Sequence, residues 1–393
     1  MQKTLTIAIA PDSFKGSLTA EQAAQCIKKG FRRGFPNAEY RLIPMADGGE
    51  GTVAAMTSAT NGRLVYVRVC GPLGRSVRAA FGVTGDGQTA VIEMAAASGL
   101  PLLKLSERNP LKTSTCGTGE LIRKALDLGV KHMVIGIGGS ATVDGGMGMA
   151  RALGAKFLDA RGREVPEGGG ALGRIKKIDL SNLDARLKTV RLDVACDVTN
   201  PLVGSKGAAE VYGPQKGATP AMVKVLDAGL RNLSAVIQRD LGMLVRDIPG
   251  SGAAGGLGAG LLAFLGAKLK RGVTTVIDTV GLKDRLMGCD LVVTGEGRMD
   301  AQTAYGKTPA GVAGVARRLK IPVVAICGCV GRDVPQVRGA GIDVYFSALQ
   351  ENMAPEDVRA RAAEMLGDCA AQVAFMWRLG MQKRCATSRQ PDF

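Results

Sequence analysis

Strand and helix patterns alternate at both ends of this sequence, and this alternation is the feature that most constrains its fold. The β-branched run TLTIAIAP (4–11) predicts a buried strand. Thr19, with Gln22 three residues later, forms a capping-box pattern that begins a helix with apolar residues at helical spacing. A second apolar run, YRLIPM (40–45), predicts the next strand. A β-α-β order of this kind is typical of a layered, parallel sheet.

The same alternation returns near the C-terminus, where three short apolar runs are followed by a helix predicted from Pro355 to Leu379. The residues between the two ends differ, because they hold hairpin-like stretches and glycine loops. A chain of 393 residues also exceeds the size at which one core keeps growing. The sequence therefore predicts an α/β fold of two domains: a Rossmann- or flavodoxin-like parallel-sheet domain from residues 1–62 plus 286–380, an inserted α/β domain at 63–285, and a loose tail at 381–393.

The composition argues against several classes of function. The net charge is +16, but the basic residues are dispersed and aromatic residues make up only 4% of the chain, so we expect no nucleic-acid partner. No apolar run is long enough to cross a membrane. Nine cysteines without a CxxC pair are typical of thiols in a reducing cytoplasm, which is the location we expect. The single histidine, His132, excludes multi-histidine metal sites, and we interpret it as structural.

Polar loops follow the first two predicted strands. APDSFKGS places Asp12, Ser13 and Lys15 at the end of the first strand. A lysine there can bind a phosphate or carboxylate, and an aspartate can hold Mg²⁺ or accept a proton. MADGGEGT places Asp47 and Glu50 on either side of two glycines. That pair suits a hydrated Mg²⁺, but a solvated turn explains it equally well.

A third loop, in HMVIGIGGSATVDGG, allows two interpretations. Gly136, Gly138, Gly139 and Ser140 lie in a match to G-x-G-x-x-[GA], and Asp159 follows about where a ribose-binding acid would stand. That pattern predicts a nicotinamide-dependent dehydrogenase. The dinucleotide loop normally follows the first strand of its domain, however, and this one does not. A loop whose backbone N–H groups hold an anion needs fewer assumptions.

Two further loops hold candidate binding residues. ACDVTNPLVG places Asp197 and Asn200 after a predicted strand, where they could bind a metal or the substrate. The run SGAAGGLGAGL contains Gly252, Gly255 and Gly256. These glycines could open a helix at a phosphate, or they could allow tight helix packing, and the sequence does not separate the two.

The stretch TGEGRMDAQTAYGKTP resembles a Walker phosphate loop but lacks one of its essential residues. Ala301 stands where the first glycine is needed for the backbone to wrap a phosphate. Glu296 and Asp300, together with Arg298 and Lys307, are better suited to a site that handles a metal and charged oxygens together.

Ten motifs occur in an order that closely resembles the glycerate kinase type-1 family of bacteria: APDSFKGSLTA, PMADGGEGT, CGPLG, EMAAASGL, GTGELI, GIGGSAT-DGG, ACDVTNPLVG, PQKGA, GAAGGLG and TGEGRMDAQTAYGK. The resemblance spans residues of about 3–380. It implies ATP- and Mg²⁺-dependent phosphorylation of D-glycerate, with 2-phosphoglycerate as the product. A kinase that forms 3-phosphoglycerate, a dehydrogenase and a non-catalytic phosphate sensor are the alternatives. Val143 departs from the family pattern, where an asparagine is usual.

Given this resemblance, we expect direct in-line phosphoryl transfer, which asks the protein mainly for positioning and charge neutralisation. The expected roles are as follows: Lys15, Asp197, Arg298 and Asp300 catalytic; Asp12, Ser13, Asp47, Glu50 and Asn200 substrate-binding; Gly136, Gly138, Gly139, Ser140, Gly252, Gly255, Gly256 and Lys307 nucleotide-binding; Asp197, Glu296 and Asp300 metal-binding. With no histidine in a suitable place, an aspartate is the expected base. The expected ligands are D-glycerate, ATP and Mg²⁺, and the sequence leaves a monomer and a homodimer open.

Overall fold

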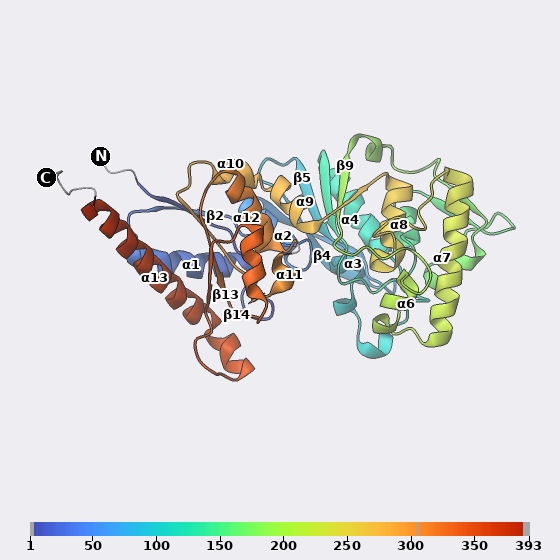
Figure 1. Cartoon of the computed structure of the whole chain (residues 1–393). Helices are drawn as coiled ribbons and strands as arrows, with labels where there is room; N and C mark the ends of the chain where they lie inside the picture. Colours follow the sequence, from blue (N-terminus) through green and yellow to red (C-terminus); the bar gives the residue numbers. More distant parts are fainter. Residues whose placement is uncertain (1–3, 305, 388–393) are drawn as a thin grey trace. The chain divides into compact units, whose positions relative to one another are not determined.

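The computed structural model describes residues 4–304 and 306–387 and divides the chain into two compact units (Figure 1). The terminal unit contains residues 1–47 and 276–393, so it is built from both ends of the chain. The inserted unit contains residues 48–275. The predicted arrangement of an α/β parallel-sheet domain with a second α/β domain inserted in the chain is confirmed.

A five-stranded sheet of parallel strands forms the centre of the terminal unit. If only the five strands of this sheet are numbered, in chain order, they lie across the sheet as 2-1-3-4-5, which is the flavodoxin-like order. From one edge to the other they are β2 (Glu39–Leu42), β1 (Thr6–Ile9), β11 (Leu291–Thr294), β13 (Val323–Cys327) and β15 (Val344–Ser347). A short pair, β12 (Arg298–Met299) and β14 (Cys329–Val330), follows the ends of β11 and β13.

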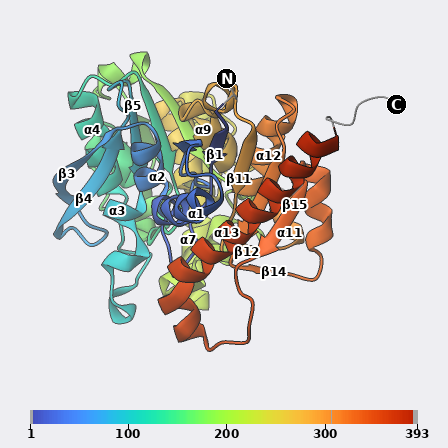
Figure 2. The same cartoon turned by 90° about the vertical axis from the view of Figure 1, so that its left-hand side faces the viewer.

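Two helices cover one face of this sheet, and they pack closely on each other (Figure 2). They are α1 (Ala20–Gly34) and α13 (Pro355–Thr387). Thr19 makes the predicted capping box with Gln22 at the start of α1. A Cβ added at Gly30 would lie 2.3 Å from the carbonyl oxygen of Gly367, so only glycine allows this approach of the two helices. The shorter helices of the unit are α10 (Leu282–Leu286), α11 (Ala301–Ala304) and α12 (Thr308–Arg318), of which α12 packs on β11 and β13.

The unit boundaries differ from the predicted ones at 62/63 and 285/286. The first boundary follows Asp47, because α2 (Thr52–Ala59) packs on strands of the inserted unit. A Cβ added at Gly82 of that sheet would lie 2.1 Å from the hydroxyl of Thr57 in α2. The tail also differs, because α13 continues to Thr387, so residues 381–387 are helical. Residues 388–393 of the predicted tail lie outside the described residues.

The inserted unit has a six-stranded mixed sheet. The hairpin predicted at its start is present, since β3, β4 and β5 are antiparallel, and the remaining strands are parallel. In order across the sheet the strands are β10 (Lys268–Lys270), β9 (Arg191–Ala195), β6 (His132–Gly136), β5 (Thr89–Glu93), β4 (Ser76–Val83) and β3 (Arg63–Cys70), and a separate pair is formed by β7 (Lys156–Leu158) and β8 (Lys177–Asp179). The helices are α2, α3 (Ala95–Ser98), α4 (Cys116–Asp127), α5 (Met147–Ala152), α6 (Ala208–Tyr212), α7 (Pro220–Leu241), α8 (Ala253–Leu265) and α9 (Gly272–Thr279), which crosses the second boundary.

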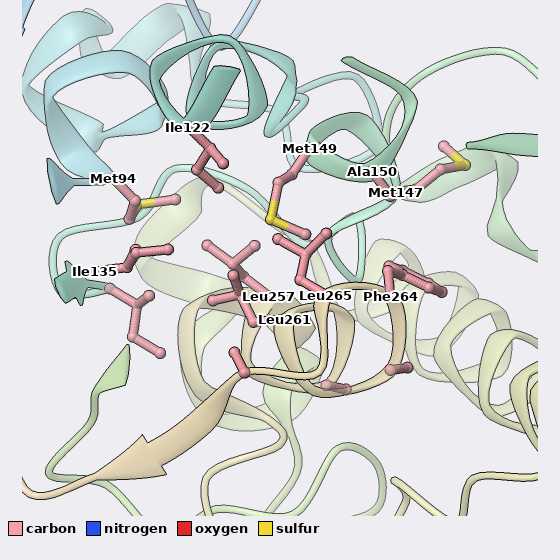
Figure 3. Packing of buried hydrophobic residues seen from close by; sticks show 14 of the residues in the cluster. Met94, Ile122, Ile135, Met147, Met149, Ala150, Leu257, Leu261, Phe264 and Leu265 are labelled. Carbon is pink, nitrogen blue, oxygen red and sulfur yellow. The ribbon is translucent and has the colours of Figure 1, made fainter. Parts of the chain in front are cut away.

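The core of the inserted unit is continuous from the sheet to α8. Figure 3 shows Leu257, Leu261 and Leu265 of α8 on the side of the helix that faces Met149 and Ile122. All of these side chains are buried. Burial of such side chains contributes roughly 1.5–3 kcal/mol each, so this contact fixes α8 against α4 and α5. No described helix is both long enough and apolar enough to span a membrane.

Candidate active site

The loops that leave the five parallel strands of the terminal unit surround one cavity of about 380 Å³. In a flavodoxin-like sheet, the strand order reverses between the first and third strands, here β1 and β11, and ligands bind at their carboxyl ends. Asp12 follows β1 and Glu296 follows β11, and both line the cavity. The N-terminal part of α13 closes the cavity on the remaining side.

Asp12 is the buried carboxylate at this switch point, with an exposed fraction of 8%. Its Oδ2 accepts a hydrogen bond from the hydroxyl of Thr308 at 2.5 Å, and its Oδ1 accepts one from the N–H of Ser13 at 2.6 Å. Burial raises the pKa of Asp12 to about 6, and the nearby Asp47 carboxylate adds to the rise. Lys15 acts in the opposite direction. Asp12 is therefore mainly ionised at neutral pH but able to accept a proton.

Glu296 also lines the cavity, near enough to Asp12 for the two carboxylates to interact, and it belongs to a connected set of charged groups. Its Oε1 accepts a hydrogen bond from the hydroxyl of Thr303 at 2.6 Å. Burial raises the pKa of Glu296 to about 7. The ammonium of Lys307 stands between two carboxylates, 3.7 Å from Glu296 and 3.8 Å from Asp300. The place between Glu296 and Asp300 is thus one that stabilises a cation.

The remaining predicted residues of the terminal unit also meet here. The ammonium of Lys15 is 3.8 Å from Asp47, and the guanidinium of Arg298 is 3.6 Å from Asp300. Lys15 is largely exposed, with 80% of its side chain accessible, so its charge is available to a ligand. The cavity lining brings together seven of the predicted residues, namely Asp12, Ser13, Lys15, Asp47, Glu296, Arg298 and Lys307, and Asp300 adjoins them.

The donor set of this cavity fits Mg²⁺. Carboxylate oxygens are among the ligands that Mg²⁺ prefers, and Glu296 in the cavity lining and the adjoining Asp300 supply them. The described residues contain no group of three or more carboxylate, cysteine or histidine side chains placed to hold a metal. Magnesium usually keeps several waters and uses only one or two protein carboxylates with substrate phosphates, so a full protein cage is not required.

Three predicted residues lie at one end of the sheet in the inserted unit. Glu50 is exposed just before α2, and Asp197 and Asn200 follow β9. One carboxylate oxygen of Asp197 accepts a hydrogen bond from the N–H of Gly272 at 2.9 Å. The side chain of Asn200 is engaged at both ends, by the carbonyl of Lys206 at 2.8 Å and by the hydroxyl of Tyr212 at 2.7 Å. Asn200 therefore fixes the shape of its own loop.

The loop after β6 is held by a buried lysine that the sequence did not reveal as a site residue. The ammonium of Lys216 donates to the hydroxyl of Ser140 at 2.6 Å and to the carbonyl of Thr142 at 2.7 Å. Burial lowers the pKa of Lys216 to about 7, and Asp144 partly opposes this change. Gly138 and Gly139 stay exposed, so their backbone remains accessible. The motif PQKGA contained the signal, but a lysine is rarely fully buried.

Asp144 is a second residue that the sequence analysis missed. It is fully buried, and its Oδ2 accepts hydrogen bonds from the N–H and the hydroxyl of Thr115, both at 2.8 Å. The N–H groups of Gly146 and Gly148 also donate to its carboxylate. Burial raises the pKa of Asp144. The side chain ties the β6 loop to the start of α4.

The dehydrogenase interpretation does not fit the geometry after β6. A dinucleotide fingerprint requires its helix to begin within the glycine motif, but α5 begins only at Met147. The carboxylate of Asp159 accepts hydrogen bonds from the N–H groups of Arg161 and Arg163 in its own turn. This turn leaves β7, which pairs with β8 in a sheet that has two strands among the described residues, so Asp159 is not placed as a ribose-binding acid.

At the start of α8, Gly252 and Gly255 are packed against backbone, and Gly256 is packed against the side chains of Leu202 and Leu230. A Cβ added at Gly252 would lie 2.1 Å from the carbonyl oxygen of Pro201, and one added at Gly255 would lie 2.0 Å from that of Thr142. Gly255 and Gly256 also have positive φ values of 69° and 86°. These contacts favour the interpretation of tight packing, and phosphate binding by these glycines stays a prediction.

The fold and the cavity together define an α/β protein of the kind that binds nucleotides and small anions at the switch point of a parallel sheet. The profile of the glycerate kinase family matches residues 7–378. The chain is 53% identical to a glycerate kinase of Bacillus subtilis (strain 168), over 95% of this chain and 98% of that protein. It is 50% identical to the glycerate 2-kinase of Escherichia coli (strain K12), over 96% of this chain and 99% of that one.

A crystal structure of a Salmonella typhimurium LT2 protein, assigned as a glycerate kinase 2, superposes with a TM-score of 0.90. The two sequences are 50% identical, and the match covers 97% of this chain and 100% of the other. The chain therefore belongs to the glycerate kinase family, as the ordered motifs predicted.

Proposed function

We propose that the protein is an ATP- and Mg²⁺-dependent glycerate 2-kinase that transfers the γ-phosphoryl group directly to D-glycerate. Family membership and the Escherichia coli relative named glycerate 2-kinase support this proposal. The structural observation that carries it is the cavity at the switch point between β1 and β11, where buried carboxylates stand beside exposed cations. Phosphoryl transfer needs such positioning and charge neutralisation from the protein.

In this proposal, Asp12 accepts the proton of the attacking hydroxyl group. A pKa of about 6 leaves Asp12 ionised at neutral pH and close enough to that pH to act as a base. Thr308 and the N–H of Ser13 fix the orientation of its carboxylate. Lys15 and Arg298 neutralise the carboxylate of glycerate and the charge on the transferred phosphoryl group.

Glu296 and Asp300 would hold Mg²⁺ in the terminal unit, and the metal-binding role of Asp197 stays a separate prediction from the sequence. When bound beside these carboxylates, Mg²⁺ would neutralise charge on the phosphates of the nucleotide. Thr303 fixes one oxygen of Glu296, and Lys307 contributes a further positive charge beside both carboxylates. Lys307 neutralises part of the carboxylate charge. It also lines the cavity, where its ammonium is suited to contact the nucleotide phosphates.

One experiment tests the proposed reaction. The purified protein is incubated with D-glycerate and ATP-Mg²⁺, ADP formation is followed, and the product is examined by ³¹P NMR. We expect ADP and 2-phosphoglycerate. A 3-phosphoglycerate signal would retain the kinase but change the acceptor hydroxyl, and no ADP above background would contradict the kinase. A rise in melting temperature with NAD(H) but not with ATP-Mg²⁺ would instead favour the dehydrogenase.

Replacing Lys15 by alanine should lower kcat/KM for glycerate by roughly 10²-fold, because the loss of a charge-assisted contact costs about 2–3 kcal/mol. Its exposed ammonium supports few contacts within the fold, so the melting temperature should change little. Lys15→Arg should keep part of the activity. Lys29→Ala, which removes an exposed lysine of α1, is the matched control and should leave kcat/KM unchanged. Normal kinetics for Lys15→Ala would remove Lys15 from the site.

The oligomeric state and the cytoplasmic location stay predictions. Size-exclusion chromatography with light scattering distinguishes the monomer from the homodimer directly.

A further inference from the structure

The N-terminal part of α13 gives the terminal-unit cavity an apolar wall. This α13 wall consists of Val358, Ala362, Met365 and Leu366. Their i, i+4, i+7, i+8 spacing places them on one face of the helix. Further along α13 the same face is buried in the core of the unit, where its residues are Cys369, Ala370, Val373 and Ala374.

The two parts of this apolar face differ in what covers them. In the later part, Gly34 of α1 lies against Ala374, and a Cβ added at Gly34 would be 2.9 Å from that of Ala374. In the α13 wall, Val358, Ala362 and Met365 instead keep part of their surface accessible, and they face the cavity of about 380 Å³. The fold thus leaves apolar surface at a ligand-binding position rather than in the core.

The cavity lining also contains charged side chains. The cations are Lys15, Arg298 and Lys307, together with Arg359 of α13 itself, and the carboxylates are Asp12, Asp47 and Glu296. A ligand that matches both the cations and the α13 wall has several anionic oxygens and an apolar part. Glycerate does not meet this description, because it carries four oxygens on three carbons and has no apolar surface to cover the wall. A purine nucleotide has both parts, a flat base and a chain of phosphates.

We infer that the α13 wall binds the purine base of the nucleotide, with the phosphates directed toward Lys15, Arg298 and Lys307. This inference rests on the proposed use of ATP. It assigns the base to the terminal unit, whereas the glycine loops of the inserted unit were predicted from sequence as phosphate-binding elements. The wall is built from aliphatic side chains, so it recognises the base by apolar contact and shape.

Filling the wall tests the inference. Ala362→Phe puts a large side chain where the base is expected, and we expect ADP binding to weaken at least tenfold. Such a change corresponds to about 1.4 kcal/mol. Binding of tripolyphosphate, which has phosphates but no base, should change less than twofold. Both ligands are measured by isothermal titration calorimetry on the full chain in the absence of glycerate, so the measurement does not depend on turnover.

Ala363→Phe is the matched control, because Ala363 is the next residue of the same helix and is exposed. It should leave both ligands unaffected. Should Ala362→Phe fail to fold, as judged by its melting curve, Met365→Gln replaces it and should weaken ADP severalfold. Unchanged ADP binding in the folded variant would overturn the inference. A rise in KM for glycerate alone would also overturn it, by assigning the wall to the acceptor.

The proposed reaction and this inference fail separately. If the α13 wall binds ADP but the wild type forms no ADP from ATP and glycerate, the proposed reaction is contradicted and the base site is supported. If the enzyme is active and its ADP affinity is unchanged by Ala362→Phe, the proposed reaction is supported and the base site is contradicted.

Discussion

Asp12→Asn should lower kcat/KM for glycerate by about 10³-fold or more while the protein remains folded. General base catalysis contributes typically about 10²–10⁴-fold, and Asp12 is the proposed base. Asparagine has nearly the same shape and retains a carbonyl oxygen that can accept from Thr308 or from the N–H of Ser13. It cannot take a proton from the acceptor hydroxyl. Loss of activity in a folded variant would therefore report the chemistry and not the packing. The measurement is a steady-state assay of ADP release alongside a thermal melt.

The matched control is Asp343→Asn. Asp343 precedes β15, and its carboxylate accepts a hydrogen bond from the N–H of Val323 at 2.8 Å. Like Asp12, it is a hydrogen-bonded aspartate at a strand end of the same sheet. It does not line the cavity in the described part of the chain. We expect kcat/KM near the wild-type value for this variant. A loss of less than tenfold for Asp12→Asn would exclude Asp12 as the base and leave Glu296 or Asp300 to be tested in the same way.

The residues predicted for the terminal-unit site meet at one cavity because they follow strands that are recognisable from local patterns. Asp12, Asp47 and Glu296 each come directly after an apolar run, and parallel strands bring their carboxyl ends to one edge of a sheet. The strand order itself was not predictable. It depends on which distant strands pair, as when Ile7 of β1 aligns with Leu291 of β11.

Other features escaped the sequence analysis for physical reasons. The helical pattern of α2 does not reveal which sheet it packs on, so the sequence placed the first boundary at 62/63, whereas the compact units divide after Asp47. The apolar stripe of α13 was recognised, but spacing alone cannot distinguish core positions from the wall of a cavity, because both need the same residue types. Ala362 and Ala370 differ only in what the rest of the unit brings near them.

Lys216 was missed because burial of an ammonium depends on partners that are distant in sequence. Ser140 and Thr142 accept its hydrogen bonds across more than seventy residues of chain. The side chain is about 1% exposed. Because the ammonium is removed from solvent, the stability of the folded protein depends on pH.

The free energy of unfolding of the wild type should rise, relative to Lys216→Met, as the pH increases from 7 to 10. The pKa of Lys216 is lowered by burial to about 7, against an ordinary value of 10.5. Between these two values the unfolded chain holds a proton that the folded protein has lost, so raising the pH favours the folded state. Below pH 7 both states are protonated, and the cost of burial is constant. One pKa unit corresponds to about 1.4 kcal/mol, so the wild type should gain on the order of 4 kcal/mol relative to the variant across this range.

Methionine has a similar length, carries no charge and leaves the hydroxyl of Ser140 and the carbonyl of Thr142 without their donor. That loss costs roughly 1–3 kcal/mol and does not change with pH, so it offsets the two curves without altering their slopes. Urea unfolding of both proteins at pH 7, 8, 9 and 10 gives the difference directly, since other titrating groups cancel. Lys224→Met, an exposed lysine on α7, is the control and should follow the wild type in parallel. Parallel curves for Lys216→Met would instead mean that Asp144 holds Lys216 charged in the folded protein, and that the buried loop after β6 contains an ion pair.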